Sequence, residues 1–430
     1  MFCPPLNPTV VGGGFGGGFA LPDPLPIQKD LHMRILALST WWPEPADNGS
    51  RMRIMHLLRA LCSRHEVHLL AFTQGPSEGV QRTELTQLCA SVQAFARPGR
   101  PLTSADRLKS LVVNEPASVR ATWSAQFAQA AQATAASLRT DAVVAMEIDV
   151  APYARLIKGT TRILEDLELN FMLQQHRLQR APHKRLRYLL TALKHRSYVK
   201  HILRDFAAVT VVSTDEAALA RQIVGAQALT VAVVPNGADV AGSSRYHYAP
   251  DADTLIYPGA LAYHANLDAV QFFLQTMHPL IRQVRPQATL RVTGRNTAEQ
   301  RAALMPHEGV EFTGYVEDIR ALIARSSVEV VPLRQGSGTR LKILEALAVG
   351  APVVTTRKGM EGLALKAGEH LLVADTPQAF ARATLDLLAS AALRQRLSAA
   401  GRQAVAERYD WSKIAADFCA LVEACAQKGS

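Results

Sequence analysis

The sequence predicts an α/β protein built from two doubly wound units, each with a parallel sheet. Three observations carry this prediction. The chain has 430 residues, which exceeds what a single hydrophobic core usually supports. Apolar runs of strand length alternate with helical patterns along the chain, and this alternation is typical of parallel strands joined by helices. The alternation starts again after a polar, turn-prone stretch at residues 236–253.

The first unit is expected at residues 33–238, after a Gly- and Pro-rich extension at residues 1–32. The extension contains VVGGGFGGGFALPDPLP, which cannot bury enough apolar surface to offset its ordering entropy, so we expect disorder there. Because Met33 directly precedes the first convincing strand, a native start at Met33 is an alternative. Strand-length runs then follow in order: RILALS (34–39), VHLLAF (67–72), VQAFA (92–96), AVVAM (142–146), TRILEDL (161–167), AAVTVVS (207–213) and TVAVVP (230–235).

Helical patterns separate these strands, at about residues 50–64, 80–90, 121–139 and 214–224. The second unit is expected at residues 254–410, after a linker at 239–253. Its strand-length runs are TLIYPG (254–259), TLRVTG (289–294), VEFTG (310–314), VEVVPL (328–333), APVVTT (351–356) and HLLVA (370–374).

Helices in the second unit are predicted at about 267–284 and 341–350, with Gly350 well placed as the C-terminal stop of the latter. The rest of the chain is predicted to be helical to its end, the last helix at residues 411–430. In open α/β sheets, ligands bind at the carboxyl ends of the strands. Two such units facing each other therefore predict a binding cleft between them.

The composition argues against several other classes of protein. The sequence is 48% hydrophobic and 20% charged, as expected for a globular protein and not for a disordered one. Its five cysteines are scattered without metal-ligand spacing, so a zinc site and a disulfide framework are not expected, and a reducing cytosol fits best. We predict no membrane-spanning helix, because no apolar run reaches the roughly 18–20 residues that a span needs. We also predict no signal peptide, because the N-terminus lacks a basic region followed by an apolar one.

Positive charge is concentrated in one stretch, residues 172–204, which carries nine basic residues and no acidic one and is predicted to be helical. The nine are Arg177, Arg180, Lys184, Arg185, Arg187, Lys194, Arg196, Lys200 and Arg204. A basic helical stretch of this length indicates an anionic partner, either phospholipid headgroups or a phosphorylated acceptor. An ordinary solvated helix face is an equally good interpretation.

The strongest local signal is the glycine-rich turn at 336–340, GSGTR, between the strand VEVVPL and the helix LKILEALAVG. Backbone N–H groups at such a turn, together with the helix dipole, favour a phosphate, and Arg340 and Lys342 add positive charge. Glu345 lies within an apolar helical sequence, where an unpaired charge is unfavourable. A functional role, such as binding a ribose diol, is therefore favoured over a plain surface Glu. The turn matches neither a Walker A loop nor a dinucleotide fingerprint.

These residues belong to a longer segment, PLRQGSGTRLKILEALAVGAPVVTT (332–356), which resembles the donor-binding motif of GT-B fold glycosyltransferases. The resemblance is to the large retaining family 4, or group 1, type, near sugar transferases associated with exopolysaccharide synthesis. YPGALAYHANLDAVQFF (257–273), LRVTGRN (290–296), VEFTGYVEDI (310–319) and ERYDWSKIA (407–415) are similar to other parts of that family, as are VVPNGAD (233–239) and the stretch 39–72. The resemblance implies two Rossmann-like domains around a central cleft, with the last helix crossing back to the N-terminal domain.

The resemblance also implies a nucleoside-diphosphate sugar as donor substrate. The family often has two glutamates separated by seven residues, and Glu345 matches the second, implied to bind the ribose. Ser337 stands at the first position, which leaves the donor hexose open. Arg295 is implied to face the diphosphate, and Gly49, before a helix with Ser50 as a plausible N-cap, to let the N-terminal backbone approach it. The other donor-binding candidates are His264, Asn266, Gly314, Tyr315, Val316, Gly338, Thr339, Arg340 and Lys342.

The activity implied is transfer of a hexosyl group, with retention, to a glycan or lipid-linked acceptor in exopolysaccharide or cell-envelope polysaccharide synthesis. No cofactor, metal or nucleic acid is expected, and the location is cytoplasmic, with the basic stretch at the inner membrane face or on an anionic acceptor. No general base is assigned: Glu165, Asp166, Glu168 and His176 are candidates, each equally well explained as structural. A sugar-nucleotide epimerase and a non-catalytic nucleotide-sugar-binding protein remain the alternatives.

Overall fold

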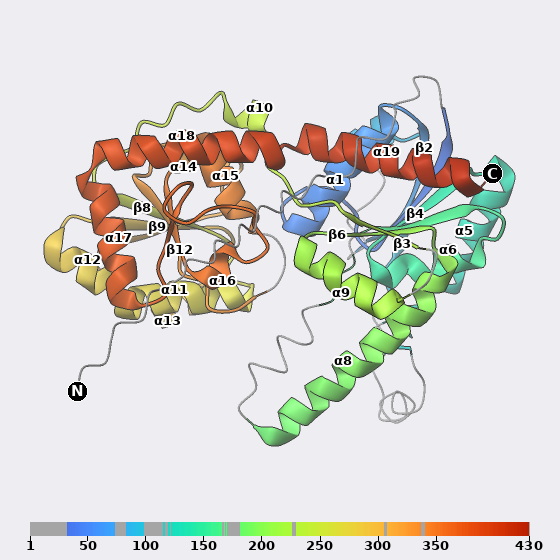
Figure 1. The fold of residues 1–430 in the computed structure, drawn as a ribbon, viewed down its shortest axis with the longest axis horizontal. Helices are drawn as coiled ribbons and strands as arrows, with labels where there is room; N and C mark the ends of the chain where they lie inside the picture. The colour runs from blue at the N-terminus through green and yellow to red at the C-terminus, as the bar shows by residue number, and fades with distance from the viewer. Residues whose placement is uncertain are drawn as a thin grey trace, which may run out of the picture.

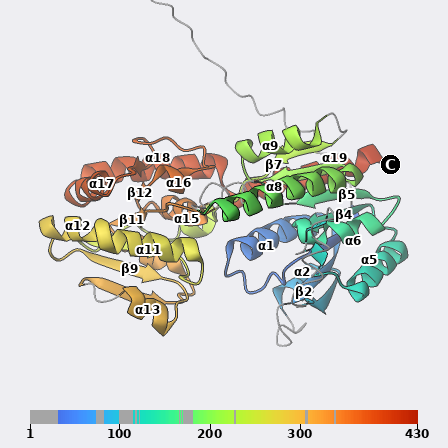
Figure 2. The same cartoon turned by 90° about the horizontal axis from the view of Figure 1, so that it is seen from below.

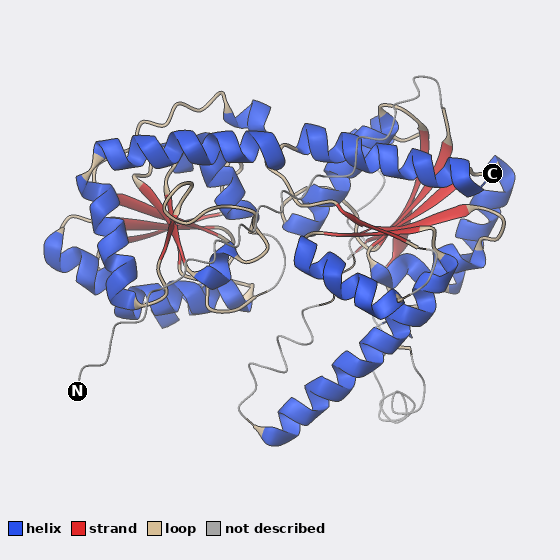
Figure 3. Ribbon diagram, viewed as in Figure 1, coloured by secondary structure: helices blue, strands red, loops and turns tan. Residues whose placement is uncertain are grey.

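The computed structural model describes residues 32–73, 83–98, 115–116, 119–120, 122–165, 167, 169, 181–225, 229–304, 308–336 and 340–429. These residues form two lobes, each a parallel β-sheet with helices on both faces (Figures 1 and 3). The predicted pair of doubly wound units is therefore confirmed. The predicted N-terminal extension, except for His32, lies outside the described residues.

The N-terminal sheet has seven strands in the order β3-β2-β1-β4-β5-β6-β7. They are β1 (Arg34–Ser39), β2 (Glu66–Thr73), β3 (Ser91–Ala96), β4 (Ala142–Met146), β5 (Thr161–Glu165), β6 (Ala208–Val211) and β7 (Thr230–Val233). The C-terminal sheet has six, in the order β10-β9-β8-β11-β12-β13. They are β8 (Thr254–Pro258), β9 (Thr289–Thr293), β10 (Val310–Gly314), β11 (Val328–Val331), β12 (Val353–Thr355) and β13 (Leu372–Val373).

Helices connect the strands and cover both sheets. In the N-terminal half they are α1 (Gly49–Cys62), α2 (Glu84–Leu88), α5 (Ala125–Leu138), α6 (Ala151–Leu156), α8 (Pro182–Ile202) and α9 (Thr214–Val224), with 3-10 turns η1 (Ile148–Val150) and η2 (Leu203–Asp205). In the C-terminal half they are α10 (Val240–Ser243), α11 (His264–Thr276), α12 (His278–Val284), α13 (Ala298–Leu304), α14 (Ile319–Ala324), α15 (Leu341–Val349), α16 (Arg357–Met360), α17 (Pro377–Ala389), α18 (Ala391–Arg408) and α19 (Trp411–Gly429).

The central strands of the N-terminal sheet are buried on both faces, because they consist mainly of apolar residues. On β1, Leu36 and Leu38 face one core with α5, α6, α8 and α9. Ile35 and Ala37 alternate with them and face the opposite core, with α1 and α19. The last helix thus completes the N-terminal core, although it follows the C-terminal sheet in sequence. Figure 1 shows α18 over one lobe and α19 over the other.

Several predicted boundaries differ from the structure. The single helix predicted at 267–284 is two helices, α11 and α12, because Pro279 lacks the N–H that a continuous helix needs and starts a new first turn. The helix predicted from Ser50 begins at Gly49, and its N-cap is Asn48, whose Oδ1 accepts a 3.1 Å hydrogen bond from the Arg51 N–H. The strand predicted at 161–167 ends at Glu165. The strand predicted at 370–374 is confined to Leu372–Val373.

The chain crosses between the lobes twice, and the two crossings lie side by side. Ala238 pairs with Asp410 in an isolated parallel bridge. The Ala238 N–H donates to the Tyr409 carbonyl at 2.7 Å, and the Trp411 N–H donates to the Ala238 carbonyl at 3.2 Å. A Cβ on Gly237 would lie 2.7 Å from the Tyr409 carbonyl oxygen, so only glycine fits this close approach. We call residues 33–237 with α19 the N-terminal domain and residues 239–410 the C-terminal domain.

Candidate functional site

The predicted donor-binding segment lies where β11 ends and α15 begins, at the carboxyl edge of the C-terminal sheet. Ser337, Gly338 and Thr339 lie outside the described residues, but the residues on both sides are placed. Gly336 has a φ of +112°, which a side chain would strain, and its carbonyl accepts a 2.9 Å hydrogen bond from the buried Arg340 guanidinium. The Arg340 side chain therefore bonds back to the start of the glycine-rich turn, and its positive charge lies at the start of α15.

Lys342 lies one residue into α15 and reaches toward the end of β8. Its Nζ donates to Asn266 Oδ1 at 3.0 Å and lies 4.1 Å from the centre of the Tyr257 ring. Asn266 is held by two further bonds, from the Tyr257 hydroxyl at 2.8 Å and to the Ala260 carbonyl at 2.9 Å. A Cβ on Gly259 would lie 2.8 Å from Lys342 Nζ, so the glycine leaves the ammonium its space. Burial lowers the pKa of Lys342 to about 7, against the opposing carboxyl of Glu329.

Glu345 is one turn further along α15 and is also half-buried. Burial raises the pKa of its carboxyl to about 7, while the nearby Arg320 guanidinium opposes this. Arg320 is itself held by Asp318 at 2.9 Å and by Asp239 at 2.9 Å. Glu345 thus lies near Asp318 and Arg320, in the part of the chain that follows the donor-binding candidates at 314–316. Gly314 there has a φ of +70° and its carbonyl accepts from the Gly294 N–H.

Arg295 links the two domains. Its Nη2 lies 3.3 Å from Asp47 Oδ2, and its guanidinium stands over the Tyr315 ring at 5.2 Å. The Arg295 side chain is 65% exposed, so the ion pair is accessible to solvent and to an anionic ligand. Asp47 was not predicted as a site residue. It places a carboxylate of the N-terminal domain opposite the proposed diphosphate position.

Gly49 of the N-terminal domain lies close to the start of α15 in the C-terminal domain. A Cβ there would lie 3.2 Å from Leu341 Cδ1, at the first residue of α15. His264, by contrast, is exposed on the first turn of α11, with its ring edge against Tyr263. Tyr315 is exposed and Val316 is half-buried. The structure therefore brings Asn266, Arg340 and Lys342 together near Glu345, with Gly49 across from them.

Glu329 is a titratable residue beside this site that was not predicted from the sequence. It lies on β11, is fully buried, and neither carboxylate oxygen has a hydrogen-bond partner among the described residues. Burial raises the pKa of Glu329 well above its ordinary value, so we expect it to be neutral, with Lys342 as the nearest opposing charge. The sequence feature that could have indicated this residue is an acidic residue within the apolar run VEVVPL.

Of the general-base candidates of the N-terminal domain, Glu165 is the one that lies among the described residues. Glu165 is fully buried, accepts a 2.6 Å hydrogen bond from Arg53 Nε, and shares Arg53 with Asn236. The structural explanation therefore holds for Glu165, because this ion pair keeps its carboxylate inside the core. Asp166, Glu168 and His176 lie outside the described residues. Across the described ranges, no group of three or more His, Cys, Asp and Glu residues could hold a metal ion.

The basic stretch lies mainly on α8, whose first turns project beyond the N-terminal domain in Figures 1 and 2. Arg177 and Arg180 lie outside the described residues. The others on α8 and η2 are exposed or half-buried: Lys184, Arg185, Arg187, Lys194, Arg196, Lys200 and Arg204. Three leucines at helical spacing, Leu186, Leu190 and Leu193, are 58%, 53% and 55% exposed. None of the helices in the described ranges has both the length and the apolar character needed to cross a bilayer.

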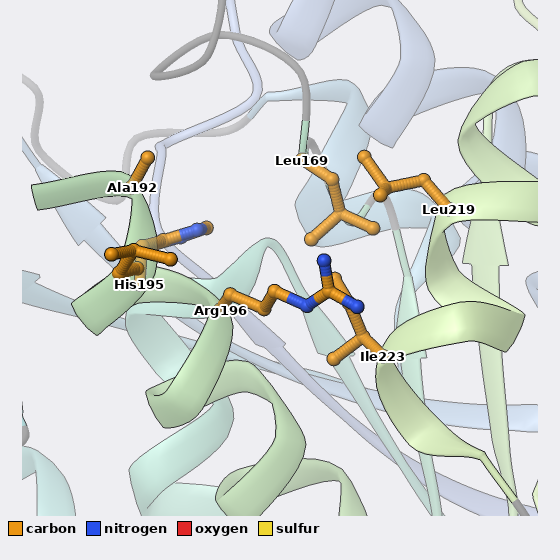
Figure 4. A pocket seen from close by; sticks show the side chains of 7 residues that line it. Leu169, Ala192, His195, Arg196, Leu219 and Ile223 are labelled. Atoms are coloured by element: carbon orange, nitrogen blue, oxygen red, sulfur yellow. The ribbon is translucent and has the colours of Figure 1, made fainter. Parts of the chain in front are cut away.

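A small hollow lies beside the middle of α8 (Figure 4). Its lining is mostly apolar, and Leu193 and Arg196 of α8 belong to it. The remaining lining residues are Leu169, Ala192, His195, Leu219 and Ile223. Burial lowers the pKa of His195, so that side chain adds no positive charge at neutral pH. The exposed surface of α8 is thus both cationic and apolar.

Comparison with known families agrees with this architecture. The family model described as "Glycosyl transferase 4-like domain" matches residues 48–237, and the one described as "Glycosyl transferases group 1" matches residues 252–390. The chain belongs to the group 1 glycosyltransferases. The two matches fall on the two sheets of this glycosyltransferase, and the second contains the whole β11–α15 segment. The predicted family is therefore confirmed.

A curated relative of this glycosyltransferase matches only part of the chain. The phosphatidyl-myo-inositol mannosyltransferase of Mycobacterium leprae (strain TN) is 35% identical over 149 residues, 33% of this chain and 39% of that protein. The match thus spans about two fifths of the length of that curated relative.

Two solved structures share the fold at low sequence identity. The sucrose-phosphate synthase of Thermosynechococcus elongatus has a TM-score of 0.66 at 19% identity, covering 91% of this chain and 98% of that one. Alr3699/HepE of Anabaena, in complex with UDP and glucose, has a TM-score of 0.62 at 16% identity, covering 91% and 100%. These similarities confirm the predicted GT-B fold.

Proposed function

We propose that this glycosyltransferase moves a hexosyl group from a nucleoside-diphosphate sugar to a glycan or lipid-linked acceptor. The observation that supports this most directly is the cluster of Lys342, Asn266, Arg340 and Glu345 around the start of α15. It combines two cations, a helix N-terminus and a carboxyl group at the carboxyl edge of a parallel sheet, where open α/β folds bind ligands.

In the proposed complex, Lys342 and Arg295 lie beside the diphosphate, and the N-terminus of α15 adds its dipole. Their positive charge is most useful when the bond to the sugar breaks, because the leaving diphosphate then gains negative charge. Glu345 accepts hydrogen bonds from the ribose diol, and the backbone at Gly314–Val316 borders the base. Asp47 gives up Arg295 to the diphosphate, which adds a step to donor binding. No metal ion is proposed, since these cations oppose the phosphate charge.

Retention of anomeric configuration and a role in exopolysaccharide or envelope polysaccharide synthesis are also proposed, on the resemblance of the motif at 332–356. Alr3699/HepE was solved with UDP and glucose, which makes a uridine nucleotide a reasonable first donor to test. The related mannosyltransferase makes GDP-mannose the second, since its printed name specifies a mannosyl group.

A thermal-shift screen of UDP-, GDP- and ADP-sugars tests the donor class, because a ligand that binds only the folded state raises the melting temperature. We expect Glu345→Ala to weaken binding of the best nucleotide by about tenfold or more, the effect of losing a hydrogen bond to a charged group. Glu369→Ala, an exposed glutamate of the same domain, is the matched control. Equal nucleotide affinity of Glu345→Ala and the control by calorimetry would remove the proposed ribose contact.

Incubation with the donor alone then separates the alternatives. A transferase is expected to release nucleoside diphosphate slowly by transfer to water and faster when an acceptor is added. Conversion of the donor to an epimeric sugar nucleotide would instead support an epimerase. Binding without turnover under any acceptor would support a non-catalytic nucleotide-sugar-binding protein.

We also propose that α8 rests on the inner surface of an anionic membrane. Its cations are attracted to acidic headgroups, and the exposed leucines 186, 190 and 193 can enter the interface. The leucines favour a lipid surface over a soluble phosphorylated acceptor, since an anionic ligand alone gives no reason to expose them. Flotation with vesicles of phosphatidylcholine, with and without phosphatidylglycerol, tests this proposal. We expect binding only with phosphatidylglycerol, weakened by Leu190→Ser and unaffected by Val284→Ser, an exposed apolar residue of the other domain.

A further inference from the structure

Glu147 has a backbone conformation that side chains normally avoid. It follows the last residue of β4 and has φ 74° and ψ 157°. This region is populated almost only by glycine, so the backbone of a glutamate there is strained. The strained residue lies at the carboxyl end of a central strand, and α/β sheets bind ligands at this edge. A glycine would adopt the same conformation freely, so the carboxylate itself is a reason to look for a role.

The surroundings of Glu147 combine aromatic and charged side chains. Its Oε2 accepts a 2.8 Å hydrogen bond from the Trp41 indole, which follows the neighbouring strand β1. The Arg97 guanidinium stands over the Trp41 ring at 5.1 Å and donates to Asp149 at 2.8 Å. Four residues after Asp149, Tyr153 stacks on Trp123, which is 43% exposed. Aromatic rings beside carboxylates suit polyhydroxylated ligands, since the rings pack on C–H groups and carboxylates accept from hydroxyls.

A short series of contacts connects Glu147 with the donor side of the cleft. The Glu147 N–H donates to the carbonyl of Glu165 at 2.9 Å, and the Glu165 carboxylate binds Arg53 on α1. Arg53 lies four residues after Gly49, which is about 6 Å along a helix. Gly49 approaches Leu341 at the start of α15, and Lys342 is the next residue. These contacts join the carboxyl end of β4 to α1, the helix whose start approaches the proposed diphosphate site.

From this placement we infer that Glu147 binds a hydroxyl group of the acceptor sugar, with Trp41 holding its carboxylate in position. The inference rests on the proposed transferase function and specifies its acceptor side. It assigns to the N-terminal domain a carbohydrate subsite bordered by Trp41, Arg97 and Asp149. Glu147 binds and orients the hydroxyl, and the inference assigns it no bond-making step.

Two variants test whether the Glu147 carboxylate binds a ligand or only supports the fold. Glu147→Gln keeps the shape of the side chain and removes its charge, and Glu147→Gly removes the carboxylate together with the backbone strain. Arg139→Gly is the control, because Arg139 has a φ of 49° at the exposed end of α5, outside the site. The readouts are the midpoint of thermal unfolding, the affinity for UDP and GDP by calorimetry, and the binding of methyl glycosides by saturation-transfer NMR in the presence of nucleotide. The probes are the methyl α- and β-glycosides of glucose, mannose, galactose and N-acetylglucosamine.

We expect wild type and Arg139→Gly to bind at least one methyl glycoside, and both Glu147 variants to bind it at least about tenfold more weakly. Nucleotide affinity should stay within about twofold in all variants, so a failure here is distinct from a failure of the proposed donor site. Glu147→Gly should unfold at the same temperature as wild type or higher, like Arg139→Gly. Unchanged glycoside binding in both Glu147 variants would overturn the inference. So would a lower unfolding temperature of Glu147→Gly, or the absence of glycoside binding by wild type.

Discussion

Replacing Lys342 by Met tests the centre of the proposed donor site. Methionine keeps the apolar stem that packs against Tyr257 but removes the ammonium that donates to Asn266. Asn266 keeps its hydrogen bond from the Tyr257 hydroxyl, so no buried acceptor is left unpaired. The change therefore removes one charge from the site and leaves its hydrogen-bonded frame in place.

Two effects of opposite sign are expected. Lowering the lysine pKa from 10.5 to about 7 corresponds to an ammonium destabilised by ~5 kcal/mol, at ~1.4 kcal/mol for each tenfold factor. Because Lys342 is partly exposed, we expect only ~1–2 kcal/mol of this to appear as extra stability in Lys342→Met. The same change removes a charged contact with the diphosphate, worth ~1.5–3 kcal/mol, so nucleotide affinity should fall by about 10- to 150-fold.

Calorimetry with the nucleoside diphosphate found in the screen measures the affinity, and urea unfolding measures the stability. Lys366→Met, at an exposed lysine of the same domain paired with Glu369, is the matched control and should change neither by more than about twofold or 0.5 kcal/mol. Nucleotide affinity equal to wild type in Lys342→Met would refute the assignment of Lys342 to the diphosphate. Lower stability would refute the view that its ammonium is unfavourably buried.

Further predictions concern pH, the core and the domain crossing. Nucleotide affinity should be greatest near pH 7 and fall on both sides. Glu345 accepts hydrogen bonds from the ribose only when ionised, above its pKa of about 7, while Lys342 attracts the diphosphate only when protonated, below its pKa of about 7. Calorimetry from about pH 5.5 to 9 measures the affinity, and a monotonic profile would contradict the prediction. Arg53→Met should lower the free energy of unfolding by ~3–5 kcal/mol, because Glu165 is then left as an unpaired buried charge. Adding Glu165→Gln should restore much of this stability, as measured by urea unfolding. A double variant as unstable as the single one would count against this account. Gly237→Ala should lower the melting temperature, since its Cβ would meet the Tyr409 carbonyl, and an unchanged midpoint would show that the crossing adapts.

Much of the fold could be predicted because each strand is a compact apolar run. The strands at 34–39, 142–146 and 310–314 match the prediction residue for residue. Burial on both faces makes such runs continuous, which distinguishes them from the helices between them. The break between α11 and α12 was missed although Pro279 marks it, because the apolar helical pattern continues across the break.

The candidate site was predictable where its residues are neighbours in sequence. Arg340, Lys342 and Glu345 follow one glycine-rich turn, so their pattern alone suggested phosphate and ribose binding. The contact between Lys342 and Asn266 depends on how α15 packs beside the end of β8, which spacing along the chain does not determine. The Arg295–Asp47 pair depends on the relative position of two domains.

Glu147 shows a different limit of sequence reasoning. A glutamate after an apolar strand has no feature that reveals a positive φ, because its conformation is set by the chain on both sides. The strain becomes visible only in three dimensions, together with the Trp41 contact.

The paired crossings at Ala238 and Asp410 make the C-terminal domain an insertion within the N-terminal one. The N-terminal core is complete only when α19 returns to it, so the chain cannot be divided into two stable halves at one point. Residues 239–410 can instead be treated as a cassette. Exchanging that cassette for the same region of a relative, while keeping α19 and the glycine at 237, is the natural way to build chimeras that combine one N-terminal domain with different C-terminal domains.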